Sequence, residues 1–130
     1  MFKVYLAIMA GGGLGAMARF WLSGLLASRF GETFPLGTLV VNILGCFIIG
    51  IFTGMTGPDS VFAVPVLVRQ FVVFGVLGGF TTFSSFSMQT FALMAEGQWL
   101  YAGANIMLSV FCCLVAVWLG VLLASVLVPG

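Results

Sequence analysis

Polar side chains recur at helical spacing inside stretches that are otherwise apolar. Thr38 and Asn42 are four residues apart. Tyr101, Asn105 and Ser109 repeat that spacing over two turns. Residues four apart lie on one face of an α-helix, so each stretch carries a polar stripe. Hydroxyl and amide groups on such a stripe can donate hydrogen bonds to a bound anion or to a neighbouring helix, and the spacing leaves both interpretations open.

A third stretch, residues 78–87, replaces the expected aliphatic side chains with paired glycines and five hydroxyl residues. We predict a break in the helix here, because unwound backbone is tolerated at membrane depth where it is buried in protein or lines a cavity. Carbonyl groups that end the first half-helix would face a cation, and amides that open the second would favour an anion. Alternatively, the GxxxG pattern from Gly75 to Gly79 is a close-packing face.

Two aromatic side chains lie beside these hydroxyl groups. Phe83 and Phe86 are three residues apart, so both rings could project toward the space that Ser84, Ser87 and Asn42 line. The edge of an aromatic ring carries positive quadrupole charge, and a ring presented edge-on can contact an anion without a formal cation. The alternative is ordinary packing, since the chain contains 14 phenylalanines and spacing alone cannot single out these two.

The distribution of charged residues also favours an anion. Arg19 is the one charged residue expected deep within an apolar stretch, and no acidic residue lies deep in any of them. Proton-coupled and cation-exporting carriers generally need a titratable carboxylate at membrane depth. Neutral donors, one embedded cation and aromatic edges therefore favour an anion as the bound species. Arg19 could instead be structural, either by capping backbone carbonyls or by extending to the headgroups.

The elements that position these residues are predicted by composition. The chain of 130 residues has four basic and three acidic residues and is 62% hydrophobic, whereas soluble proteins contain about 25% charged residues. Four stretches reach the length of about 20 apolar residues that a membrane helix needs. We predict an all-α membrane protein with one domain, residues 1–130, and a third helix broken in mid-membrane. The predicted spans are 4–28, 36–55, 66–95 and 99–128, with a Gly57-Pro58-Asp59 turn between the second and the third.

Several classes of function are excluded by what the chain contains. It has no histidine, so no Ser-His-Asp or Cys-His nucleophile can form, and we expect no enzyme. A net charge of +1 without a basic cluster predicts no binding to nucleic acid. Cys46, Cys112 and Cys113 lack CxxC spacing and a histidine partner, which argues against a metal site or a redox pair. We interpret them as small residues for helix packing.

The basic residues do not define one orientation in the membrane. With four spans, Lys3 and Arg69 lie on one side, and Arg29 lies on the other, with Arg19 if its side chain extends to that end. We infer insertion in both orientations and pairing of opposed copies as an antiparallel homodimer. The alternative is a weakly biased protein whose topology is set by another feature.

The chain resembles the Fluc, or CrcB-type, fluoride channels of bacteria over essentially its whole length. Each of the first three predicted helices contributes a motif to this resemblance: Gly12-Gly13-x-Gly15-Ala16-x-x-Arg19, Gly37-Thr38-Leu39-x-x-Asn42-x-x-Gly45 and Gly78-Gly79-Phe80-Thr81-Thr82-Phe83-Ser84-Ser85-Phe86-Ser87. The resemblance implies a passive, fluoride-selective channel of the bacterial inner membrane. Such a channel exports cytoplasmic fluoride and lowers its toxicity.

The same resemblance implies an antiparallel dual-topology homodimer with two pores and a central structural sodium ion. It assigns Phe83 and Phe86 as the pore phenylalanines and Asn42 as the pore amide. The backbone carbonyls of Gly78 and Thr81 correspond to the sodium ligands.

Tyr101 and Ser109 belong, by this resemblance, to a polar track beside the phenylalanines. Asn105 stands where we expect a hydroxyl residue in many relatives, and Gln89 stands where the family often has glutamate. These departures leave the details of the track open.

Two other classes of protein share the length and helix count. A small dual-topology multidrug exporter depends on a membrane-embedded glutamate, which the predicted spans do not contain. In a non-conducting membrane assembly subunit, the hydroxyl groups of residues 81–87 would only bind helices together.

Overall fold

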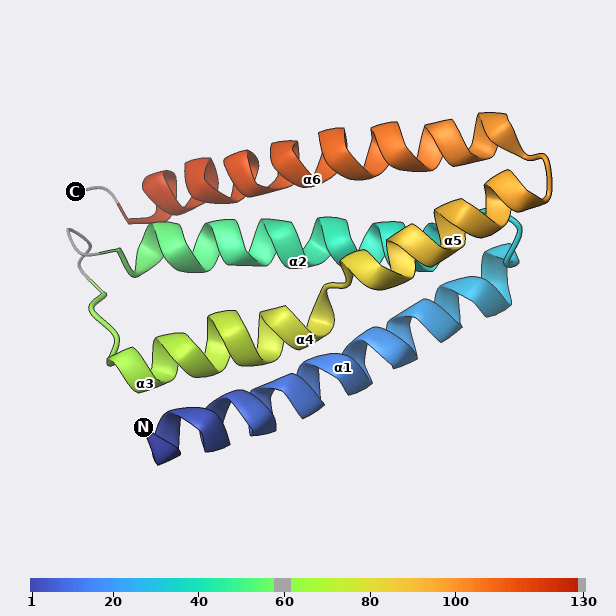
Figure 1. Cartoon of the computed structure of the whole chain (residues 1–130). Helices are drawn as coiled ribbons and strands as arrows, with labels where there is room; N and C mark the ends of the chain where they lie inside the picture. Colours follow the sequence, from blue (N-terminus) through green and yellow to red (C-terminus); the bar gives the residue numbers. More distant parts are fainter. Residues whose placement is uncertain (58–61, 129–130) are drawn as a thin grey trace.

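Within the residues that the computed structural model describes, 1–57 and 62–128, all regular secondary structure is helical. Four helices within these residues are long and apolar enough to cross a membrane, which confirms the predicted number and the multi-pass class. They run side by side as a bundle (Figure 1). Pro58 and Asp59 of the predicted turn lie outside the described residues. The helical elements are α1 (Phe2–Phe30), α2 (Leu36–Met55), α3 (Val66–Arg69), η1 (Gln70–Leu77), α4 (Gly78–Phe80), α5 (Phe83–Ala95) and α6 (Trp99–Leu127).

The third membrane span is a composite element. It begins as α3, widens into the π-helical segment η1, and returns to an α-helical turn in α4. Thr81 (φ −85°, ψ 156°) and Thr82 (φ −153°, ψ 117°) are extended, so the helix stops and restarts as α5. Figure 1 shows the resulting step between α4 and α5 near the middle of the span. The predicted break is therefore present, whereas the π-helical turns preceding it were not predicted.

Glycines bring α1 against the first half of this span. A Cβ atom on Gly11 would lie 2.7 Å from the Phe71 carbonyl oxygen, and one on Gly79 would lie 2.5 Å from the Gly12 carbonyl oxygen. Such distances leave no room for a side chain, so the backbones touch directly, as in other small-residue membrane interfaces. Gly75 and Gly79 therefore form a close-packing face, and the helix break is present as well. The two interpretations of this stretch are both correct.

Helices α2 and α6 run parallel and pack along their length (Figure 1). At Gly50 a Cβ atom would meet the backbone of α6 at Val117 and would be 3.2 Å from the Gly120 Cα. One turn further, a Cβ on Gly54 would lie 3.5 Å from the Val121 Cα. The contact therefore advances by one turn on both helices together, which keeps the two polar stripes in a constant register.

Candidate functional site

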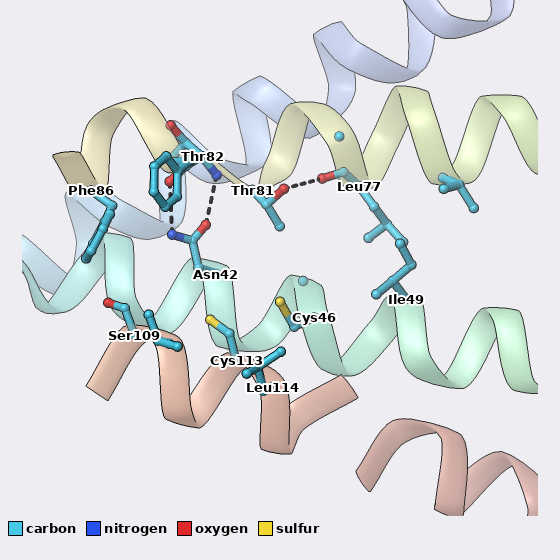
Figure 2. Close-up of a pocket in the computed structure, with 15 residues that line it drawn as sticks. Asn42, Cys46, Ile49, Leu77, Thr81, Thr82, Phe86, Ser109, Cys113 and Leu114 are labelled. Atoms are coloured by element: carbon cyan, nitrogen blue, oxygen red, sulfur yellow. Dashed lines mark hydrogen bonds between the residues drawn. The ribbon is translucent and has the colours of Figure 1, made fainter. Parts of the chain in front are cut away.

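Asn42 bridges the break in the third span. Its Nδ2 donates to the Thr82 carbonyl oxygen at 3.0 Å, and its Oδ1 accepts from the Thr82 backbone N–H at 2.8 Å. Figure 2 shows both bonds reaching from α2 to the unwound segment. The pair satisfies both backbone groups of an extended residue, which would otherwise lack the bonds of a continuous helix.

The hydroxyl residues at the break hold the ends of the two half-helices. Thr81 Oγ1 donates to the Leu77 carbonyl oxygen at 3.0 Å and so closes the first half-helix (Figure 2). Thr82 is the N-cap of α5, and its Oγ1 accepts from the Ser85 backbone N–H at 3.2 Å. Threonine is a favoured N-cap because its hydroxyl oxygen can accept from one of the first free amides.

These bonds redirect the amides that a continuous helix would send to Gly78 and Thr81. In an unbroken α-helix the Thr82 N–H would bind the Gly78 carbonyl, and the Ser85 N–H would bind the Thr81 carbonyl. Here the first amide donates to Asn42 and the second to the Thr82 hydroxyl. The two carbonyls that the resemblance assigns as sodium ligands are thus among those released by the break.

Arg19 reaches the same segment from α1. Its Nε donates to the Gly79 carbonyl oxygen at 3.1 Å, and the side chain is partly buried. One of the carbonyls that end the first half-helix therefore receives a cationic donor. This contact fits the structural alternative for Arg19, in which the guanidinium caps a backbone carbonyl.

A cavity of about 420 Å³ opens beside the break, between α2, α6 and both halves of the third span. Among the residues described by the structure, none that lines it carries a formal charge. Phe86 is buried at 8% exposure, whereas Phe83 is 76% exposed, and their ring centroids are 5.2 Å apart at an interplanar angle of 44°. The amide, hydroxyl and aromatic residues of its lining are Asn42, Thr81, Thr82, Phe83, Phe86 and Ser109.

The polar stripe of α6 divides into two parts. Asn105 is 2% exposed and its Nδ2 donates to Thr90 Oγ1 at 2.9 Å, while Ser109 Oγ donates to Asn105 Oδ1 at 3.4 Å. These three side chains form a buried chain that ends at the cavity. Tyr101 lies apart from it, with its ring edge-on to Phe34 at 6.1 Å between centroids.

A second cavity, of about 700 Å³, lies next along α2 and α5. Thr38 lines it one helical turn before Asn42, and Gln89 lines it about one turn after Phe86. The acidic residues Glu32 and Glu96 also line it. Gln89 Oε1 is buried and has no hydrogen-bond partner among the described residues. The polar stripe of α2 thus touches both cavities, whereas the stripe of α6 reaches only the first, through Ser109.

The family of CrcB-like proteins (Camphor Resistance, CrcB) matches residues 6–121, which covers parts of all four long helices. The chain belongs to the CrcB family. A relative from Rhodospirillum rubrum named "Fluoride-specific ion channel FluC" is 56% identical over 116 residues, 89% of this chain and 90% of the relative. A second protein with that name, from Opitutus terrae, is 57% identical over 118 residues, 91% of this chain and 89% of the relative.

The fold brings together residues of this CrcB protein that spacing did not connect. Thr90 was not singled out in the sequence, although it follows Phe86 by one turn and binds Asn105. Cys46 and Cys113 were interpreted as packing residues, and both line the cavity. Ser84 and Ser87 bond locally instead, to Thr82 Oγ1 at 3.2 Å and to the Phe83 carbonyl at 3.0 Å. Hydroxyl residues in a helix often bond within their own turn, a tendency that spacing does not reveal.

Proposed function

We propose that this CrcB protein is a fluoride-selective passive channel that exports cytoplasmic fluoride and lowers its toxicity. One structural observation carries the proposal: a cavity beside a broken helix is lined by neutral donors and aromatic side chains, and no charged residue of the described chain lines it. The name of both relatives, "Fluoride-specific ion channel FluC", supports fluoride as the ion.

Fluoride is small and strongly hydrated, so a pore must replace several water contacts at once. Asn42 can contribute because its Nδ2 carries two hydrogens, and the bond to the Thr82 carbonyl uses one of them. Ser109 adds a hydroxyl group whose one hydrogen would turn from Asn105 Oδ1, 3.4 Å away, toward the ion. Phe83 and Phe86 add ring edges with positive quadrupole charge. The second cavity, with Thr38 and Gln89, extends the polar route toward one end of the bundle.

Conduction without an energy source follows from the same chemistry. A multidrug exporter with an embedded glutamate needs a carboxylate at the substrate site, and the cavity beside the break has none among the described residues. Hydrogen fluoride crosses membranes as a neutral weak acid and dissociates in a less acidic cytoplasm. A passive route for fluoride ions would then let the trapped anion leave.

Purified protein in liposomes loaded with potassium fluoride should release fluoride rapidly once valinomycin allows potassium to follow. Liposomes loaded with potassium chloride should show no comparable chloride release, because chloride is larger and binds the same donors less strongly. An ion-selective electrode measures both. Absent fluoride release would favour the non-conducting assembly subunit, and equally fast chloride release would contradict selectivity.

The proposal includes an antiparallel dual-topology homodimer in the inner membrane of a bacterium. Lys3 and Arg69 belong to the end of the bundle where the N-terminus lies, and Arg29 belongs to the opposite end, so neither end dominates (Figure 1). The buried residues of α1 are only Gly11 and Gly15, which leaves most of its apolar side chains for lipid or a second copy. Helical bundles suit the inner membrane, whereas the bacterial outer membrane carries β-barrels.

A tag at the N-terminus should be accessible from both sides of the membrane. Equal inserted populations are expected because the positive charges are nearly balanced between the ends. Protease digestion of the tag in intact spheroplasts and in inverted vesicles measures the two populations. Adding several lysines before Phe2 should shift the tag to the cytoplasmic side, and exclusive protection of the unmodified protein in either preparation would refute dual topology.

A structural sodium ion forms the last part of the proposal. Sodium is a hard cation that prefers oxygen ligands, and the carbonyls of Gly78 and Thr81 have lost their usual helical donors to Asn42 and Thr82. These two carbonyls fit such an ion, and the matching pair from an opposed copy would complete its ligands. The ion would supply positive charge at the break and hold the two half-helices together.

A further inference from the structure

Two cysteines from different helices face each other in the cavity beside the break. Cys46 lies on α2 one turn after Asn42, and Cys113 lies on α6 one turn after Ser109. We call the line of contact between α2 and α6 the seam. The next pair along it is Gly50 against Val117, where the backbones touch. Because α2 and α6 run parallel in constant register, the seam places Cys46 opposite Cys113.

The cavity lining agrees with this register. Cys46 and Cys113 both line the cavity, the first from α2 and the second from α6. Figure 2 shows the two side chains next to each other between α2 and α6. All three cysteines are free thiols of intermediate exposure, and Cys112 is not part of the cavity lining.

We propose that Cys46 and Cys113 form a binding site for a thiophilic cation that prefers two ligands in a line, with mercury(II) as the probe, and that the bound cation blocks the adjacent anion route. The block of the anion route rests on the proposed function, whereas the binding of the cation does not. The lack of CxxC spacing and of a histidine partner predicted no metal site at these cysteines. The parallel packing of α2 against α6 brings the two cysteines close together.

The chemistry of the cavity favours this class of cation. Each thiol loses its proton to solvent as its S–Hg bond forms, so mercury(II) and two thiolates give a neutral S–Hg–S unit with no change in oxidation state. A neutral complex avoids the cost of burying charge in an apolar cavity. Zinc(II) requires four ligands in a structural site, and the described lining offers only these two thiols.

Close packing of α2 against α6 allows the two thiols to bind one cation together, as a chelating pair. Backbone contact at Gly50 and Val117 holds the two helices together one turn away, so the second thiol is presented at high effective concentration once the first has bound. We expect the pair to retain mercury(II) about 100-fold more tightly than a single thiol of the same protein. The bound ion would lie one turn from Asn42 and Ser109, within the volume that fluoride is proposed to cross.

The test measures binding and conduction separately on the purified full-length protein. After incubation with mercuric chloride and passage over a desalting column with a monothiol competitor, retained mercury is measured by mass spectrometry. Wild type and Cys112→Ser should each retain one mercury per chain, and Cys46→Ser and Cys113→Ser should retain almost none. Cys46→Ala and gel filtration check that any loss is not due to misfolding.

Retention by the Cys46→Ser and Cys113→Ser variants, or loss in Cys112→Ser, would overturn the binding site. Retention of zinc(II) as tight as that of mercury(II) would overturn the linear two-ligand geometry. In liposomes, mercuric chloride should slow fluoride release of the wild type and Cys112→Ser about tenfold or more, but not that of Cys46→Ser. Bound mercury with unchanged fluoride release would overturn the block alone. Absent fluoride release without mercury would instead defeat the proposed function and leave the binding result intact.

Discussion

Replacing Phe86 with isoleucine is expected to reduce fluoride flux by about tenfold or more while the protein remains folded. Phe86 is buried at 8% exposure, and its ring lines the cavity together with Asn42 and Ser109. Isoleucine fills much of the same volume but has no aromatic edge, so a dehydrated anion loses a contact of about 1.4 kcal/mol, which corresponds to roughly a tenfold change in rate. Fluoride release from liposomes at equal protein content measures the effect.

Phe91→Ile is the matched control for this experiment. Phe91 lies on the same helix, is 65% exposed, and does not line the cavity, so its replacement should leave flux unchanged. Phe83→Ile should also reduce flux, because the Phe83 ring contacts the Phe86 ring and lines the cavity despite its exposure in the single chain. Unchanged flux in both the Phe83 and the Phe86 variants would remove the aromatic-edge mechanism.

The Asn42→Ala substitution is expected to abolish conduction and to lower the stability of the protein. Alanine would leave the Thr82 N–H and carbonyl groups without the two bonds that Asn42 now supplies. An unpaired backbone group that water cannot reach costs about 1–3 kcal/mol, so the loss should be visible as a lower midpoint of thermal unfolding in detergent. Conduction should fall as well, because the amide is a proposed ligand of fluoride.

Thr53→Ala provides the control on the same helix. The Thr53 hydroxyl donates to the Ile49 carbonyl at 2.7 Å within α2 and makes no bond to another helix among the described residues, so its removal should change neither flux nor unfolding temperature appreciably. Asn42→Asp separates the two roles further. An aspartate can still accept from the Thr82 N–H, but it places negative charge on the anion route. An Asn42→Ala protein with wild-type stability would contradict the bridging role, and one with wild-type flux would contradict the ligand role.

In the third span, the local sequence predicted the helix break but not the π-helical turns before it. Paired glycines followed by hydroxyl residues predicted a break within residues 78–87, and Thr81 and Thr82 are indeed extended. The π-helical turns of η1 carry no comparable sequence signal. They are accompanied by close contact with α1, since a Cβ on Gly75 would lie 3.0 Å from the Gly11 Cα. A π-helix depends on such tertiary context more than on intrinsic preference.

For the site residues, too, the sequence predicted which residues matter but not which groups they contact. Asn42 was predicted as a pore amide, yet nothing in the spacing indicated that both ends of its amide would bind the backbone of Thr82. Tyr101 shares the helical face of Asn105 and Ser109 but packs against Phe34. The assignment of fluoride ligands among these residues stays a prediction that the flux measurements above address.

Composition and spacing alone were sufficient for the membrane class, the four helices and the broken third span. All of these depend on a property that each segment carries by itself: enough apolar length to cross a bilayer, or too many glycine and hydroxyl residues to continue as a simple helix. The tertiary structure decided which residues meet. Asn42 with Thr82, Arg19 with Gly79, and Cys46 with Cys113 are brought together by glycine contacts between helices, and such contacts depend on pairs of segments rather than on either segment.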